Sequence, residues 1–522
     1  MADRTARDLT ADLEAARQAV LDEGRPEAVA KRHGKGLMTA RERVAALVDT
    51  GSFREIGSLV EPHRDNDFNR DFVAPADGII VGTGRIDGRS TIVASHDYTV
   101  HGGSSGKAGS RKLDRVLNRA IDHGLPVVYL LEGGGHRIQD GMQSSHFAGA
   151  SPVFQNMARL SGWVPTVAAM MGQGFAGPTN YAALADFVVM VRGGATMGMA
   201  GPALVRAGTG EEIDKEALGG AARQADEHGI ADLAVDSEAE CLAAARRFLS
   251  YFSANARAAL PITATDDPID RRDDALLDLV PADSRKTYDV RKVIDVVADR
   301  DSVFELKPTY ARNIVTSLVR LDGRPVGFVA NQPLRKGGML DSAACEKAAH
   351  FIGLCDAFGL PLVLLIDVPG FAIGSSAEMS GLGRRSGRLL FELGIATVPR
   401  VSIVLRKGYG GGYYAMGGGR SFEAEAAFAW PTAEICAMSI EGAVDVAFKR
   451  DYQSAEDPAT ARQALIDRIK GQTGALGAAE DFGIDEVIDP RDSRRLLIET
   501  FAQSAPRRPD RNPPRIRPIS PI

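Results

Sequence analysis

Hydrophobic and polar residues follow one another in a pattern that predicts short strands joined to helices. Two apolar strands are expected within residues 78–97, on either side of Asp87-Gly88, a dipeptide typical of a two-residue hairpin turn. A helix is expected near Arg111–Asp122, because its apolar residues recur at helical spacing. Buried strands are expected over Val127–Leu131 and Thr166–Met171, and each of them leads into a run of glycines. The unit is therefore a β-β-α arrangement with glycine loops just after strands.

The same order returns in the second half of the chain. Strands are expected around Asp322-Gly323, a helix near Ser342–Ala357, and further strands over Leu362–Ile366 and Arg400–Leu405. Gly124-Leu125-Pro126 returns as Gly359-Leu360-Pro361, about 235 positions later, a period far longer than that of stacked repeats. The sequence therefore predicts a duplicated α/β fold, in which two related halves could supply one site.

The predicted boundaries follow from this duplication. One domain is expected over residues 1–262 and a second over 263–505, with an acidic linker near 260–281 between the repeats. Residues 506–522 are rich in proline and arginine and are expected to be an extended tail that could embrace a partner subunit. Residues 5–23 predict an amphipathic helix that packs on the body or on a neighbouring subunit.

Composition narrows the class of protein. Of 522 residues, 44% are hydrophobic and 25% charged, as in soluble globular proteins. The net charge of −6 argues against a nucleic-acid partner. Four cysteines lie far apart, which argues against a zinc ribbon or a disulfide framework, and no bound metal is expected. The polar N-terminus and the absence of a long apolar run predict a cytoplasmic protein without a membrane partner.

Two glycine-rich loops are the candidate functional sites. Gly133-Gly134-Gly135 follows a predicted buried strand, and Gly408–Gly412 follows the equivalent strand of the second half, where Gly174–Gly177 is its counterpart in the first. Glycine lets a backbone approach a ligand closely, and its N–H groups can stabilise an oxyanion. Taken singly, either loop could instead be a tight turn with only a structural role. The presence of such a loop at the equivalent place in both halves favours a functional role.

At these loops the chain resembles the carboxyltransferase (β) subunit of biotin-dependent acyl-CoA carboxylases, within the crotonase superfamily. The resemblance covers about residues 25–515. The segments that carry it are Glu132–Gln139, Val329–Pro333, Leu365–Phe371, Arg406–Gly411 and Trp430–Glu434. The resemblance implies two duplicated crotonase-like ββα spiral domains, the first on the acyl-CoA side and the second on the biotin side. It also implies a hexamer with active sites between N- and C-terminal domains of different subunits.

The resemblance further implies carboxyl transfer from N1 of carboxybiotin to the α-carbon of an acyl-CoA. By motif, the thioester oxyanion hole falls on Gly134 and Gly135, with the His136 amide as a further donor, and the biotin-side hole falls on Gly411 and Gly412. The residues expected to bind substrate are His136, Gly174, Gly177, Tyr409, Tyr414, Lys107 and Arg111. Biotin would arrive on a separate α subunit that carries biotin carboxylase and the carboxyl carrier, because no Ala-Met-Lys-Met motif is present. The chain would form a hexamer alone or with a related β subunit.

The chain departs from the family pattern at several of these positions. The family commonly has Ala where this chain has His136 and Gly412, and an Asp in propionyl-CoA-type members where it has Tyr414. The identity of the acyl group therefore stays open. Three rival classes also stay open: the carboxyltransferase component of a decarboxylase, a biotin-independent hydratase or isomerase using Glu132, His136 or Asp367, and a non-catalytic partner of a hexamer.

Overall fold

The computed structural model describes residues 4–64, 67–142, 144–149, 152–507 and 517–520. The chain divides into two compact units. Unit 1 contains residues 1–258 and 516–521, and unit 2 contains residues 259–515 and Ile522. The boundary lies close to the expected one at residue 262.

Each unit is built on one mixed sheet, and the two sheets have the same strand order. In unit 1 the order is β1-β2-β3-β4-β5-β6-β8, with β7 paired to β5; in unit 2 it is β9-β10-β11-β12-β13-β14-β16, with β15 paired to β13. The strands of unit 1 are β1 Arg54–Glu55, β2 Ile79–Ile86, β3 Arg89–His96, β4 Val127–Gly134, β5 Thr166–Phe175, β6 Phe187–Val191, β7 Thr196–Gly198 and β8 Leu233–Val235. Those of unit 2 are β9 Phe304–Leu306, β10 Ile314–Leu321, β11 Arg324–Asn331, β12 Leu362–Val368, β13 Arg400–Tyr409, β14 Ala426–Ala429, β15 Glu434–Cys436 and β16 Glu486–Val487. The duplicated α/β fold is confirmed by this identical topology.

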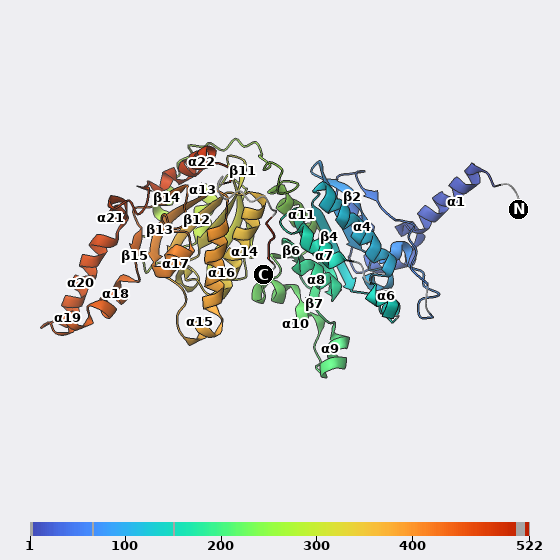
Figure 1. Cartoon of the computed structure of the whole chain (residues 1–522), viewed down its shortest axis with the longest axis horizontal. Coiled ribbons are helices and arrows are strands. Elements are labelled where there is room, and N and C mark those ends of the chain that lie inside the picture. Colours follow the sequence, from blue (N-terminus) through green and yellow to red (C-terminus); the bar gives the residue numbers. More distant parts are fainter. Residues whose placement is uncertain (1–3, 65–66, 143, 150–151, 508–516, 521–522) are drawn as a thin grey trace. The chain divides into compact units, whose positions relative to one another are not determined.

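Helices cover the sheet within each unit (Figure 1). Unit 1 carries α1 Ala6–Ala19, α2 Pro26–His33, α3 Ala40–Leu47, α4 Lys107–His123, α5 Ile138–Gly141, α6 Ser144–Ala148, α7 Val153–Leu160, α8 Gly177–Ala183, α9 Pro202–Thr209, α10 Lys215–Gly219 and α11 Glu238–Ser250. Unit 2 carries α12 Ala275–Leu279, α13 Val290–Val297, α14 Ser342–Phe358, α15 Ser375–Met379, α16 Leu382–Ile395, α17 Gly410–Ala415, α18 Ile440–Ala447, α19 Lys449–Gln453, α20 Pro458–Thr473, α21 Ala475–Glu480 and α22 Ser493–Gln503. Among the described residues, none of these helices is both long and apolar enough to cross a membrane.

The hairpin turns form as the sequence predicts. Asp87 and Gly88 both have positive φ angles, 51° and 77°, and so do Asp322 and Gly323 at 51° and 71°. Two successive positive φ angles characterise the hairpin turn whose twist matches that of its strands. In unit 1 the Asp49 carboxylate also accepts hydrogen bonds from both turn amides, at 3.1 and 2.8 Å.

A buried lysine occupies the same position of the long helix in both units. On α4, Lys112 donates through Nζ to the carbonyls of Ala76 (3.0 Å) and Ile79 (2.7 Å). On α14, Lys347 donates to three carbonyls, of Lys307, Tyr310 and Ile314, at 2.7 to 2.9 Å. Burial lowers the pKa of Lys112 to about 8. Each lysine therefore joins the long helix to the backbone around the start of the unit's hairpin.

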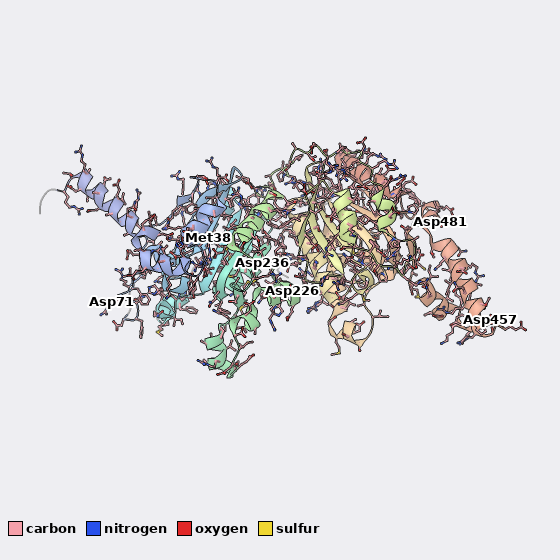
Figure 2. All side chains as sticks on the ribbon, turned by 180° about the vertical axis from the view of Figure 1, so that it is seen from behind. Met38, Asp71, Asp226, Asp236, Asp457 and Asp481 are labelled. Carbon is pink, nitrogen blue, oxygen red and sulfur yellow. The ribbon has the colours of Figure 1, made fainter. Side chains whose placement is uncertain are left out.

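The outlying helices differ from one another in how they are anchored. Helix α1 is closed by a Thr5–Asp8 capping box, but no residue on it is buried, and Figure 1 shows it projecting from the rest of unit 1. The expectation that it packs on the body of its own chain is wrong, and packing on a neighbouring subunit stays a prediction. By contrast, α18 and α20 share a small apolar core, and Asp457 caps α20 (Figure 2).

The C-terminal tail is described at residues 506–507 and 517–520 only. There, Ile519 exchanges two hydrogen bonds with Ser161 Oγ, at 2.8 and 2.9 Å, and its side chain is buried. The described end of the tail is thus part of unit 1 of its own chain.

We expect Lys112→Met to lower the free energy of unfolding by about 2–4 kcal/mol, because it leaves two buried carbonyls without their donor. Urea denaturation of the purified chain measures the change. Arg115→Met on the exposed side of the same helix is the matched control and should cost less than about 0.5 kcal/mol. Equal effects of the two changes would contradict a specific role for the buried amine.

Candidate active site

The first glycine loop lies where β4 and β5 end side by side. The two strands are parallel, and their last paired residues are Gly133 with Gly174 and Gly134 with Phe175. Gly133 and Gly135 have φ angles of 110° and 46°, which residues with a Cβ rarely adopt. The chain therefore turns sharply out of β4 directly beside the turn that leads from β5 into α8.

Gly135 and Gly177 are brought together at this point. A Cβ on Gly135 would lie 3.0 Å from Ala176 Cβ and 3.3 Å from the Gly177 nitrogen. A Cβ on Gly177 would lie 3.5 Å from Gly135 Cα, an ordinary contact distance. Gly134 and Gly174 stand further back in the β4–β5 ladder. Main-chain atoms of two turns thus converge on one spot, with Gly135 requiring the absence of a side chain more strictly than Gly177.

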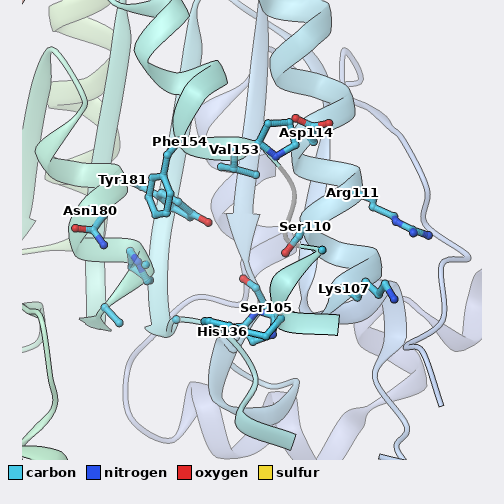
Figure 3. A pocket seen from close by; sticks show the side chains of 17 residues that line it. Ser105, Lys107, Ser110, Arg111, Asp114, His136, Val153, Phe154, Asn180 and Tyr181 are labelled. Atoms are coloured by element: carbon cyan, nitrogen blue, oxygen red, sulfur yellow. The ribbon is translucent and has the colours of Figure 1, made fainter. Parts of the chain in front are cut away.

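A cavity of about 560 Å³ opens at this spot (Figure 3). The residues that line it are Ser105, Lys107, Ser110, Arg111, Asp114, Gly135, His136, Phe147, Gly149, Pro152, Val153, Phe154, Ala176, Gly177, Pro178, Asn180 and Tyr181. Phe154 and Tyr181 form an aromatic pair whose ring centroids are 5.7 Å apart. The volume and the mixed apolar and polar wall are those of a small-molecule site. We call it the substrate cavity, after the predicted substrate-binding residues on its wall.

The predicted substrate-binding residues of the first half reach this cavity in part. His136 and Gly177 lie on its wall, and Lys107 and Arg111 extend from α4 (Figure 3). The aromatic pair was missed by sequence reasoning. Tyr181 lies on α8, four residues after Gly177, and a helical projection of the segment behind the glycines could have placed it beside the loop.

Buried charges fix the loop in place. Arg137 is almost fully buried and donates to Asp77 (2.7 Å) and Asp140 (3.4 Å). Asp77 in turn accepts the Gly109 amide of α4 at 2.7 Å. Backbone bonds from Ser105 to Gly135 (2.8 Å) and from Arg137 to Ser105 (2.9 Å) add a short ladder. The loop is therefore a rigid part of unit 1, tied to the helix that carries Lys107.

Glu132, the last residue before the glycines, forms buried ion pairs with two arginines. Its carboxylate accepts from Arg32 at 3.0 and 2.5 Å and from Arg43 at 2.5 Å, while Arg43 also pairs with Glu238. All four side chains are buried. A buried side chain stays charged only when it is paired with an opposite charge.

In unit 2 the equivalent loop follows β13. A Cβ on Gly411 would lie 3.2 Å from the Phe371 ring, and one on Gly412 would lie 2.9 Å from Gly370 Cα. The Gly411 and Gly412 backbone thus lies against the segment that follows β12, as Gly135 lies against the segment that follows β5.

Asp367 takes the position of Glu132 in this second unit. It is fully buried at the end of β12, accepts from Arg406 Nε at 3.1 Å and the Lys407 amide at 3.2 Å, and lies 3.3 Å from Lys407 Nζ. Burial lowers the pKa of Lys407, against the attraction of Asp367. Glu132 and Asp367, the two carboxylates that the hydratase hypothesis would use as acid or base, are therefore both engaged in ion pairs.

The two predicted tyrosines of unit 2 have different surroundings. Tyr409 is buried and donates through its hydroxyl to Glu434 at 2.6 Å, and burial raises its pKa well above the usual range. Tyr414 is 56% exposed on α17 and packs edge-on against Tyr413. Of the two, only Tyr414 presents much of its side chain to an incoming ligand.

In each of the two α/β units, a glycine turn lies where neighbouring strands end. A sequence profile described as "Carboxyl transferase domain" matches residues 31–517. The chain therefore belongs to the carboxyl transferase family.

Individual relatives agree with this assignment. The propionyl-CoA carboxylase carboxyltransferase subunit of Haloferax mediterranei is 39% identical over 497 residues, 95% of each chain. The methylmalonyl-CoA decarboxylase subunit alpha of Veillonella parvula is 36% identical over 491 residues, 94% of each chain. A crystal structure of transcarboxylase 12S, a hexamer assembly with methylmalonyl-coenzyme A and methylmalonic acid bound, superposes with a TM-score of 0.92 at 36% identity. The superposition covers 97% of this chain and 96% of that one.

We expect Glu132→Gln to destabilise unit 1 by about 3–5 kcal/mol, because two buried guanidinium groups lose their shared carboxylate. Thermal unfolding with and without the change measures this. Glu42→Gln, which alters a partly exposed carboxylate on the neighbouring α3, is the control and should cost about 1 kcal/mol or less. A Glu132→Gln protein as stable as the unchanged chain would refute the argument from the buried ion pairs.

Proposed function

We propose that the chain transfers a carboxyl group between carboxybiotin and the α-carbon of an acyl-CoA, as the carboxyltransferase subunit of a biotin-dependent acyl-CoA carboxylase. The observation that carries the proposal is the convergence of Gly135 and Gly177 on the wall of the substrate cavity. Main-chain donors that meet in a rigid turn can stabilise the enolate oxygen that a thioester develops when its α-proton leaves.

The residues of the chain would have three tasks. The amides around Gly134, Gly135 and His136 would hold the thioester oxygen, with Gly177 directly beside Gly135. The amides of Gly411 and Gly412 would form the hole for the ureido oxygen of biotin. Lys107 and Arg111 would attract the anionic end of the CoA ester.

Biotin, carried by a separate biotin carboxylase and carboxyl carrier subunit, would supply the carboxyl group and the base for the α-proton. Biotin is assigned as the base because the chain's two candidate carboxylates, Glu132 and Asp367, are both buried in ion pairs. We further propose a cytoplasmic hexamer, of this chain alone or with a related β subunit; the hexamer assembly of transcarboxylase 12S supports this proposal. No cluster of metal-ligating side chains occurs in the described part of the chain.

A second candidate is the same chemistry in the reverse direction. It is favoured by the similarity to the methylmalonyl-CoA decarboxylase subunit of Veillonella parvula. Tyr414 is the residue most relevant to the choice of acyl group, because it is exposed on α17 where propionyl-CoA-type members have Asp.

The test is the reverse half-reaction, which needs no partner subunit. Malonyl-CoA, methylmalonyl-CoA and longer 2-carboxyacyl-CoA esters are mixed with the purified chain and a free biotin derivative. We expect loss of the carboxyl group that depends on biotin, and the preferred ester identifies the acyl class. Loss without biotin would instead indicate a plain crotonase-type enzyme. No loss from a well-folded protein would indicate a non-catalytic chain or one that needs an obligatory partner.

In the same assay we expect Gly135→Ala to lower kcat by about 10²-fold or more, as the loss of an oxyanion donor does. The physical reason is its φ angle of 46° and the 3.0 Å contact that a Cβ would make, which together displace the turn. Gly208→Ala in α9, outside the cavity, is the matched control, since an added Cβ there meets no atom within 4 Å. The assignment of the Gly135 turn to the oxyanion hole is refuted if both changes reduce turnover, or if neither does.

A further inference from the structure

Tyr181 brings a phenol hydroxyl to the wall of the substrate cavity, and the proposed function gives this hydroxyl no task. Its side chain extends from α8, and the hydroxyl end points from that helix into the cavity (Figure 3). No hydrogen bond to this hydroxyl occurs in the part of the chain that the structure describes. A hydroxyl that faces a cavity in this state is free to bond to a ligand there.

The Tyr181 hydroxyl lies beside the two glycine turns. The point that a Cβ on Gly177 would occupy is 3.5 Å from Gly135 Cα and 4.0 Å from both Cζ and Oη of Tyr181. One position in the cavity is therefore close both to the main chain of the proposed oxyanion hole and to a side-chain donor. An oxygen atom that the amides hold there can also accept a hydrogen bond from the phenol after a small adjustment of its side chain.

Packing holds the Tyr181 ring in this place. Its centroid is 6.2 Å from that of the His96 ring, which is nearly parallel to it at 17°, and 6.4 Å from that of the Tyr129 ring. Phe154 packs against it at 5.7 Å. His96 and Tyr129 are both buried. Three rings thus fix the direction of the hydroxyl before a ligand binds, which is what an effective donor to a developing charge requires.

Helix α8 is itself fixed to the strands beside it. Thr179 Oγ1 accepts the Gly198 amide at 2.8 Å and lies 3.0 Å from the Gly174 carbonyl oxygen. Gly174 belongs to β5 and Gly198 to β7. Since Tyr181 follows Thr179 by two residues on this short helix, its backbone is as firmly placed as its ring.

The surroundings of Tyr181 keep its hydroxyl protonated. Burial raises the pKa of Tyr181 to about 12. Burial also lowers the pKa of His96 to about 4, so that the ring packed behind Tyr181 is neutral near pH 7. At that pH the phenol therefore keeps its proton and can donate it in a hydrogen bond to an anionic oxygen.

We propose that Tyr181 is a further catalytic residue of this site, whose hydroxyl donates a hydrogen bond to the thioester oxygen while that oxygen carries the enolate charge. The inference rests on the proposed function, which supplies the thioester. The proton stays on Tyr181, no bond is made or broken at the phenol, and the α-proton is taken as in the proposed function. Because a hydrogen bond to a charged oxygen is stronger than one to a neutral carbonyl, the hydroxyl stabilises the enolate more than the substrate.

Tyr181→Phe is the test, because it removes the hydroxyl and keeps the ring. In the biotin-dependent assay we expect kcat to fall about 10- to 10²-fold with KM nearly unchanged, as the loss of one hydrogen bond to a charged group does. Tyr129→Phe is the matched control. It removes a buried hydroxyl that does not line the cavity and has no hydrogen-bond partner among the described residues, and kcat should stay unchanged. Equal effects of the two changes would overturn the proposal.

The binding of two CoA thioethers gives a readout that a merely structural role would not move. Carboxymethyl-CoA carries a planar, anionic carboxylate that stands in for the enolate, and S-ethyl-CoA has no oxygen there. By calorimetry on the full purified chain, we expect Tyr181→Phe to weaken the binding of carboxymethyl-CoA about tenfold or more and to leave S-ethyl-CoA unaffected. Equal weakening of both thioethers, or of neither, would overturn the proposal. So would an unchanged chain that binds carboxymethyl-CoA no more tightly than S-ethyl-CoA.

Methylmalonyl-CoA separates the enolate oxygen from the carboxyl group that is transferred. In the absence of biotin its negative charge lies on that carboxyl group, and its thioester oxygen is neutral. We therefore expect it to bind Tyr181→Phe almost as well as the unchanged chain. A loss of affinity as large as that of carboxymethyl-CoA would place the hydroxyl on the transferred carboxylate and overturn the assignment to the enolate oxygen.

This inference and the proposed function fail in different ways. A chain without biotin-dependent turnover that still loses affinity for carboxymethyl-CoA on Tyr181→Phe would refute the proposed function and leave the role of Tyr181 standing. Biotin-dependent turnover that Tyr181→Phe does not change would refute the role of Tyr181 and leave the proposed function standing.

Discussion

A buried carboxylate at the end of a strand, neutralised by cations, is the interaction on which both glycine turns depend. Glu132 in unit 1 and Asp367 in unit 2 take this position, and each directly precedes the turn or the segment packed against it. Because removing either carboxylate would leave buried positive charges, the strand end cannot shift without a large energetic penalty. The main chain that follows is thereby held in one conformation.

This rigidity matters because the proposed chemistry rests on main-chain donors. An amide stabilises an oxyanion only when it already points at the place where charge develops. The side chains that achieve this do not line the cavity: Arg137 ties the loop to Asp77 and Asp140, and Lys112 joins α4 to the backbone at the start of β2. In unit 2, Lys347 on α14 corresponds to Lys112, whereas Arg406, which pairs with Asp367, comes from β13 and has no arginine counterpart in unit 1. The buried lysine and the buried carboxylate are thus duplicated along with the turns, but the arginines are not.

The charges of unit 1 divide its sheet into two environments. On one side, Gly135 and Gly177 open into a cavity with a strong aromatic component, suited to an acyl group. On the other, Glu132 is paired with Arg32 and Arg43. The same two strands, β4 and β5, bound both environments.

The sequence by itself determined the duplication, the hairpins at Asp87-Gly88 and Asp322-Gly323, and the placing of glycines at strand ends. These features are local, since they follow from turn chemistry and from hydrophobic period. Tertiary structure alone decided that Gly177 meets Gly135, that Tyr181 and Phe154 face the cavity, that Tyr409 is committed to Glu434, and that α1 stays unburied. The same holds for the pairing of Glu132 with Arg32 and Arg43, about 100 and 89 positions away in the chain. Such contacts join residues distant in sequence, and no period or local propensity encodes which partner a buried charge or a glycine will meet.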